Sequence, residues 1–185
     1  MARLDWPRDA AFSALAFVPM TAAALLAIDR QPSQRVQLGT IASITPDQAE
    51  AIAASGECWT VMRGAVPIAA YGLTETFPGM QAVAWALLGA DIGRAHVAMT
   101  RHVRSRIAAS PLRRIEAIVR AADIEPAIAA NPVYADDAQA LIDLAMAAPT
   151  PECRWAVALG LRPAAVLRAF GGAAETHLLF ERIRR

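Results

Sequence analysis

Residues 81–120 constrain the fold of this chain more than any other stretch. Residues 81–88 form a nearly continuous apolar run of strand length, which is typical of a strand buried on both faces. A glycine-containing loop follows, then a long helical stretch that ends at Ser110-Pro111, and residues 112–120 again favour a strand. This order predicts a strand, loop, helix and strand of an α/β domain, in which the backbone N–H groups entering the helix can bind an anion.

Length and composition limit the classes of protein to which the chain can belong. Its 185 residues, 56% of them hydrophobic, suit a single domain over 1–185. The formal charge of +1 gives no general reason to expect a nucleic acid or an anionic membrane as partner, and the absence of lysine excludes Schiff-base chemistry. Cys58 and Cys153 form no disulfide framework, and no Cys/His cluster has metal spacing. We therefore expect a soluble cytoplasmic domain without a metal.

The N-terminal part has a second interpretation. Residues 10–28 carry no charge and approach the length that spans a bilayer. Two aspartates before the run do not suit the basic start of a signal peptide, and Pro19 interrupts it. We therefore expect a buried strand over 12–18 and a helix capped by Thr21, with a membrane anchor as the alternative.

Several other elements have local signals of their own. Thr45, Pro46 and Gln48 form a capping box with proline at the first helical position, which is the clearest such signal in the chain. Turn residues at Arg63-Gly64 separate two strand-like runs. The remaining expected elements are strands over 58–62, 66–73, 165–170 and 176–183, helices over 46–55 and from Thr150 to Gly160, a loop over 31–43, and an insertion over 121–150 with a helix capped by Asp136 or Asp137.

The order of these elements and three short patterns resemble the GNAT acetyltransferase superfamily. Residues 85–87, 114–119 and 154–161 match in order the W-x-L strand, the rIEA-x-V strand and the rW-x-x-x-LG[FL] helix of small GNAT-like proteins encoded by phages and prophage-like elements. The resemblance covers most of the chain. It implies an α/β fold with a central mixed, mostly antiparallel sheet of about seven strands and helices on both faces.

The same resemblance implies acetyl-CoA as cosubstrate. In the superfamily the fourth strand opens against its neighbour, its exposed backbone bonds the pantetheine arm, and the following loop cradles the pyrophosphate. The loop here matches the last Gly and Ala of the pattern Q/R-x-x-G-x-G/A but lacks the first Gln or Arg, and an ordinary helix N-terminus is the alternative. The residues implied to bind the cofactor are Trp85, Ala86, Leu87, Ile92, Gly93, Arg94 and Ala95.

Transfer of an acetyl group to an amine needs a base for the amine and an acid for the leaving thiolate. Many superfamily members use a tyrosine of the last helix as the acid, and Ala156 stands at that position here. We take Glu75 and His177 as candidate bases and Tyr71 as the candidate acid. A solvated loop carboxylate and a surface histidine are the commoner uses of the first two residue types.

A basic cluster lies in the helix that follows the loop. Arg94, Arg101 and Arg104 are spaced by nearly whole helical turns, and His102 and Arg106 belong to the same segment. Such a stripe could meet the 3′-phosphate of CoA, and a solvated helix face is the alternative.

Two functions remain open from the sequence. The first is an N-acetyltransferase that transfers an acetyl group from acetyl-CoA to an unidentified amine. The second is a catalytically inactive GNAT-fold structural or interaction protein of a phage or phage-derived particle, which the incomplete loop pattern and Ala156 favour. Neither function requires a specific nucleic acid or a membrane.

Overall fold

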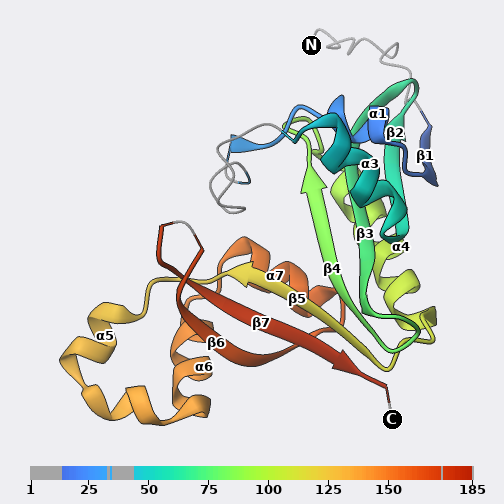
Figure 1. Ribbon diagram of the computed structural model, residues 1–185. Coiled ribbons are helices and arrows are strands. Elements are labelled where there is room, and N and C mark those ends of the chain that lie inside the picture. Colours follow the sequence, from blue (N-terminus) through green and yellow to red (C-terminus); the bar gives the residue numbers. More distant parts are fainter. Residues whose placement is uncertain (1–13, 33, 35–43, 172, 185) are drawn as a thin grey trace, which may run out of the picture.

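The computed structural model describes residues 14–32, 34, 44–171 and 173–184. Its centre is one seven-stranded sheet in the order β1-β2-β3-β4-β5-β7-β6 (Figure 1). Only β4 and β5 run parallel, so the predicted mixed and mostly antiparallel sheet is confirmed. The strands are β1 Leu15–Pro19, β2 Gly56–Arg63, β3 Val66–Phe77, β4 Gln81–Leu88, β5 Arg114–Arg120, β6 Arg162–Phe170 and β7 Glu175–Ile183.

The strand boundaries follow local chemistry with one notable extension. β4 covers the predicted run 81–88, and Gly64 with positive φ turns β2 into β3 as expected. β3 continues four residues past the predicted end at Leu73, because its last residues still pair with β4 although they are exposed. The predicted start of the first strand at Phe12 lies outside the described residues.

The pairing of β4 with β5 is confined to the beginning of both strands. Gln81, Ala82 and Val83 pair with Arg114, Ile115 and Glu116, and no residue beyond these pairs across the two strands in the described part of the chain. β5 meanwhile pairs with β7 along its whole length. The two strands therefore diverge like the arms of a V, and each arm carries its own half of the sheet (Figure 1).

A polar network holds the vertex of this V together. The Gln81 side chain of β4 donates to the Glu116 carboxylate of β5 over 3.0 Å. Arg114 bridges Glu116 and Glu181, each over 2.8 Å, and so ties β5 to β7 at the same level. These bonds lie where the strands part, and they fix the point from which the gap opens.

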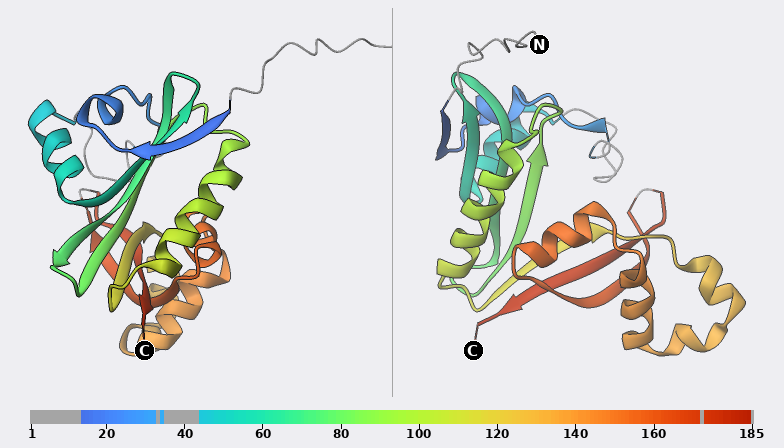
Figure 2. Two further views of the ribbon diagram at one scale, coloured as in Figure 1. Left: turned by 90° about the vertical axis from the view of Figure 1, so that its right-hand side faces the viewer. Right: turned by 180° about the vertical axis from the view of Figure 1, so that it is seen from behind.

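Helices cover both faces of the sheet, as predicted (Figure 2). On one face α1 (Ala22–Leu26) and α3 (Pro46–Ala54) pack on Cys58, Ala70 and Leu87. On the other face α4 (Ala95–Ala109) and α7 (Pro151–Ala158) form the larger core. The predicted capping box of Thr45 and Gln48 is present, and Thr21 and Thr150 cap their helices.

Residues between β5 and α7 form a small helical unit. It consists of α5 (Glu125–Ala130), a 3₁₀ helix η1 (Pro132–Asp136) and α6 (Ala138–Ala147). Asp137 caps α6 through bonds from two backbone N–H groups, which decides between the two predicted caps. Among the helices described, none is long and apolar enough to cross a membrane.

Candidate functional site

A cavity of about 400 Å³ occupies the gap between β4 and β5. One arm of the V contributes the β4 residues 83–86, and the other contributes the β5 residues 117–119. Val103 and Ile107 of α4 and Ala156 of α7 complete the wall on the helical face. Much of the space exists because the positions facing it carry alanine, since a methyl group leaves room that a larger side chain would fill.

The edge of β4 that faces the gap carries backbone groups of its even-numbered residues. Gln31 N–H donates to Leu88 O over 2.9 Å, and Ala90 N–H donates to Asp29 O over 2.8 Å. The Gln34 carboxamide continues this row, because its Oε1 accepts from Leu88 N–H at 2.5 Å and its Nε2 donates to Ala86 O at 3.3 Å. The upper end of the β4 edge is thus paired, and the stretch around Ala84 and Ala86 has no strand beside it.

The loop between β4 and α4 is tightly closed on itself. The N–H groups of Ala95, His96 and Val97 donate to carbonyls three residues earlier, and Arg63 donates to Asp91 O at 3.1 Å and to Ile92 O at 3.3 Å. Only N–H groups left free of such bonds can receive a phosphate. Gly93, with φ +44°, stands at the centre of this turn.

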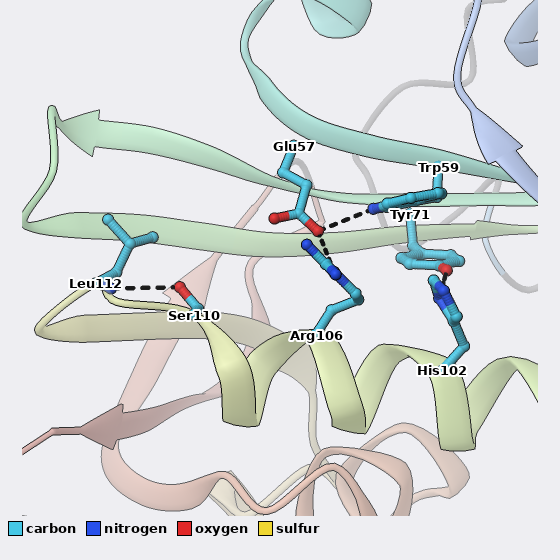
Figure 3. Close-up of polar contacts among 7 residues, drawn as sticks. All are labelled: Glu57, Trp59, Tyr71, His102, Arg106, Ser110 and Leu112. Carbon is cyan, nitrogen blue, oxygen red and sulfur yellow. Dashed lines mark hydrogen bonds and ion pairs between the residues drawn. The ribbon is translucent and has the colours of Figure 1, made fainter.

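Between α4 and the strands β2 and β3, five side chains from these three elements form a polar cluster (Figure 3). The Tyr71 hydroxyl of β3 is hydrogen-bonded to His102 Nδ1 of α4. Arg106, one turn further along α4, is paired with Glu57 of β2 at 2.5 Å, and Trp59 donates to the same carboxylate oxygen at 2.9 Å. Of this cluster, Glu57, Trp59, Tyr71 and Arg106 line the cavity.

The protonation states in this cluster follow from burial and from the neighbouring charge. The hydrogen bond from Arg106 lowers the pKa of Glu57, so the carboxylate is ionised at neutral pH. Burial raises the pKa of Tyr71, and burial together with Arg106 lowers the pKa of His102. A protonated tyrosine beside a neutral imidazole is the combination in which the hydroxyl can donate to Nδ1.

Comparison with solved structures identifies the fold. No family model and no curated protein matches the sequence. The structure is similar to an acetyltransferase of the GNAT family from Bacillus anthracis, with TM-score 0.56 and 10% identity over 91% of this chain and 94% of that chain. It is also similar to the ribosomal-protein-S18-alanine N-acetyltransferase from Escherichia coli, with TM-score 0.57 and 12% identity over 92% and 94%.

A third similar structure is an N-acetyltransferase from Staphylococcus aureus Mu50, with TM-score 0.58 and 12% identity over 92% of this chain and 99% of that chain. The chain has the GNAT acetyltransferase fold. Identities this low concern the architecture alone. The finer resemblance to phage-encoded members receives no support from these structures.

On the GNAT fold, the residues predicted to bind the cofactor divide into two groups. Trp85 and Ala86 line the cavity, whereas Leu87 is buried on the face of the sheet that α1 and α3 cover. Of the predicted loop residues, Ile92 and Ala95 are buried in the core, and Gly93 and Arg94 are exposed. Two strand residues of the predicted site therefore adjoin the cavity, whereas the loop residues can contribute little beyond their backbone.

The three predicted catalytic residues have different surroundings. Tyr71 lines the cavity but lies on β3, which is separated from the gap by β4. Glu75 is exposed and accepts from Gly79 N–H at 2.6 Å, so it stabilises the β3–β4 turn. His177 lines the cavity and is only 3% exposed, so its interpretation as a surface residue was wrong.

His177 also has an unusual feature for a buried side chain. Its Nδ1 is buried, and no described group bonds to it. Its ring contacts Phe170 of the neighbouring strand at 5.1 Å between centroids. Buried polar atoms in proteins normally have a partner, so this nitrogen has capacity for a bond to a ligand.

Sequence reasoning missed the Glu57–Arg106 pair. The sequence placed His102 and Arg106 in the same basic segment as Arg94, Arg101 and Arg104, and of these five residues only the three last named are exposed. The spacing of these residues was a usable signal. Glu57 and Trp59 are two residues apart on β2, and His102 and Arg106 are four residues apart on α4, so each pair shares one face of its element.

On the outer side of the cavity α4 and α7 are bridged directly. Trp155 Nε1 donates to Thr100 Oγ1 at 2.9 Å, and the His96 ring lies 5.2 Å from the Trp155 ring.

In the described part of the chain, no group of three or more His, Cys, Asp or Glu side chains could hold a metal ion.

Proposed function

We propose that this protein transfers an acyl group from a CoA thioester to an amine. The observation that carries the proposal is the separation of β4 from β5 after Val83 and Glu116, with the cavity between them. An unpaired strand edge is a template for a ligand that carries amide groups. The pantetheine arm of acetyl-CoA has two amides, and its length can follow β4 from the loop to the vertex.

The residues present fit such a ligand along the strand better than at the loop. The β4 edge around Ala84 and Ala86 would receive an amide of the arm, and the apolar walls of the cavity would exclude water from it. Gly93 and Arg94 would face the phosphates with backbone N–H groups and one guanidinium. We therefore expect the arm to contribute more of the affinity than the phosphates do.

The transfer itself forms a bond from the amine nitrogen to the acyl carbon and breaks the bond from that carbon to sulfur. His177 is the better placed of the two predicted bases, because it lines the cavity and Glu75 does not. Its free Nδ1 would accept the proton that the amine loses. The role of Tyr71 as the acid stays a prediction. Its hydroxyl is hydrogen-bonded to His102, and β4 lies between β3, which carries Tyr71, and the gap.

Calorimetric titration tests this function with three ligands. CoA and acetyl-CoA are expected to bind with Kd between about 1 µM and 1 mM, the common range of enzyme KM values. Adenosine 3′-phosphate 5′-diphosphate, which keeps all three phosphates of CoA but has no pantetheine arm, should bind at least about tenfold more weakly because the loop contributes little. Absence of heat with CoA at several times the upper end of that range would exclude the proposal.

Substitution of Gln34 should change this affinity in an unusual direction. The Gln34 carboxamide occupies Leu88 N–H and Ala86 O, which an amide of the pantetheine arm would otherwise use. Gln34→Ala removes this competitor, so we expect CoA to bind about 2–12-fold more tightly, the equivalent of one net hydrogen bond. Gln139→Ala on the exposed face of α6 serves as the matched control and should leave the affinity unchanged. Weaker binding after Gln34→Ala would mean that this side chain contacts the ligand itself.

A second candidate is a protein that keeps the fold and has no transfer activity. Two observations favour it: the paired upper end of the β4 edge and the small side chain of Ala156 where the superfamily commonly has an acid. For such a protein the same titrations would show no heat with any of the three ligands, and amines would not be acylated. A measurable CoA affinity with turnover would exclude it.

A further inference from the structure

The cavity is wider than the gap between β4 and β5. Besides residues of these two strands, it is lined by Leu73 and Tyr71 of β3 and by Trp59 and Glu57 of β2. It therefore runs sideways beneath α4, across β4 and β3 to β2. The free edge of β4, in contrast, runs along the strand. A ligand arm that follows the edge leaves this sideways branch empty.

The side chains along the middle of the sideways branch are apolar. Leu73, Val103 and Ile107 are 7%, 7% and 2% exposed, and Ala84 beside them carries only a methyl group on this face of the sheet. Val103 and Ile107, spaced by four along α4, form the roof, because both face the sheet. An apolar space of this kind is filled more favourably by hydrocarbon than by water.

The far end of the branch carries an ion pair that is partly exposed to solvent. Glu57 and Arg106 are paired there, and the Arg106 guanidinium lies 5.4 Å from the centre of the Trp59 ring. Because both charges are satisfied by each other and by Trp59, they do not call for a charged ligand. They do limit the length of an apolar ligand, since hydrocarbon that reached them would displace water from an ion pair.

From this geometry we infer that the acyl group carried on CoA is apolar and longer than acetyl, and that it occupies the sideways branch beneath α4. This inference rests on the proposed function. Neighbouring strands lie about 4.8 Å apart, so the branch from β4 to β2 spans roughly 10 Å. That span suits an acyl chain of about six to eight carbons, which would lie against Leu73 and Ala84 with its end near Trp59.

The test is a titration of CoA and of its saturated thioesters, acetyl-, butanoyl-, hexanoyl- and octanoyl-CoA, into the 185-residue chain. Each methylene that enters the branch should raise the affinity, by about fourfold where burial is complete. Hexanoyl-CoA is then expected to bind at least about tenfold more tightly than acetyl-CoA. Equal affinities across the series, with CoA itself binding, would overturn the acyl assignment and leave the proposed function standing. Failure of every thioester and of CoA would overturn both.

Leu73→Trp places an aromatic ring of the protein in the branch. Leu73 lies on β3 and not on the β4 edge, so CoA and acetyl-CoA should bind as to the native protein, and the gain with hexanoyl-CoA should disappear. Leu26→Trp, at an exposed position of α1, makes the same change outside the cavity and should keep the gain in full. Circular dichroism and thermal unfolding confirm that both variants are folded. If Leu73→Trp retains the gain, the acyl chain lies elsewhere and the inference is wrong.

Discussion

Ala156→Tyr is expected to raise kcat about 100-fold above that of Ala156→Phe with any amine that the protein acylates. Ala156 is 3% exposed, lies on α7 and lines the cavity, so a larger side chain at this position enters it. The superfamily resemblance places the acid that protonates the thiolate at this position. A positioned general acid contributes about 10²–10⁴-fold to a rate, and only the tyrosine of this pair has a proton to give.

The phenylalanine variant is the matched control, because both rings fill the cavity to nearly the same extent. Both are expected to lose about 1–3 kcal/mol of stability through overpacking, which the comparison cancels. Thiol release from acetyl-CoA, measured over a panel of amines, reports the rate. Equal rates for the two variants would mean that another group already protonates the thiolate, and Tyr71 would then be the first residue to substitute.

Phe180→Ala is expected to lower the free energy of unfolding by about 3–5 kcal/mol. Phe180 is fully buried, and it is opposite Ala117 of β5 in the sheet. Removing the ring loses its buried surface and leaves a cavity that a packed sheet fills only partly. In a domain of this size such a loss corresponds to a fall in Tm of roughly 6–20 °C.

Phe77→Ala provides the comparison for this prediction. Phe77 is 62% exposed at the end of β3, so its removal should change the free energy of unfolding by no more than about 0.5 kcal/mol. Urea unfolding followed by circular dichroism measures both variants. A similar loss for the two would contradict the position of Phe180 in the larger hydrophobic core.

The elements that the sequence predicted well are those with chemistry inside a few residues. The capping box at Thr45, the threonine caps at Thr21 and Thr150, and the apolar run of β4 were all confirmed, since a cap or a turn depends on neighbours three or four residues away. The length of β3 was underestimated, because its exposed end is held by pairing with β4 and has no apolar signal of its own.

The candidate site was less accessible to this reasoning. His177 was named as a candidate base, with a surface residue as the commoner alternative, and its burial follows from β6 on one side and β5 on the other, which pair with β7 at Leu167 and Arg120. The pairing of Glu57 with Arg106 was not predicted, because 49 residues separate them and no motif contains both. A charged pair of this kind is visible only when a strand and a helix have been packed together.

The segment 81–120 shows which features follow from local sequence and which depend on tertiary contacts. The sequence by itself determined its strand, its loop, its helix and its second strand, because hydrophobic periodicity and helix-ending residues act locally. Only the tertiary structure decided that the two strands pair over three positions and then part, and that Gln34, 52 residues before Ala86, occupies the edge between them. Contacts over such separations depend on how both arms of the sheet pack on their own helices, and no local pattern encodes that arrangement.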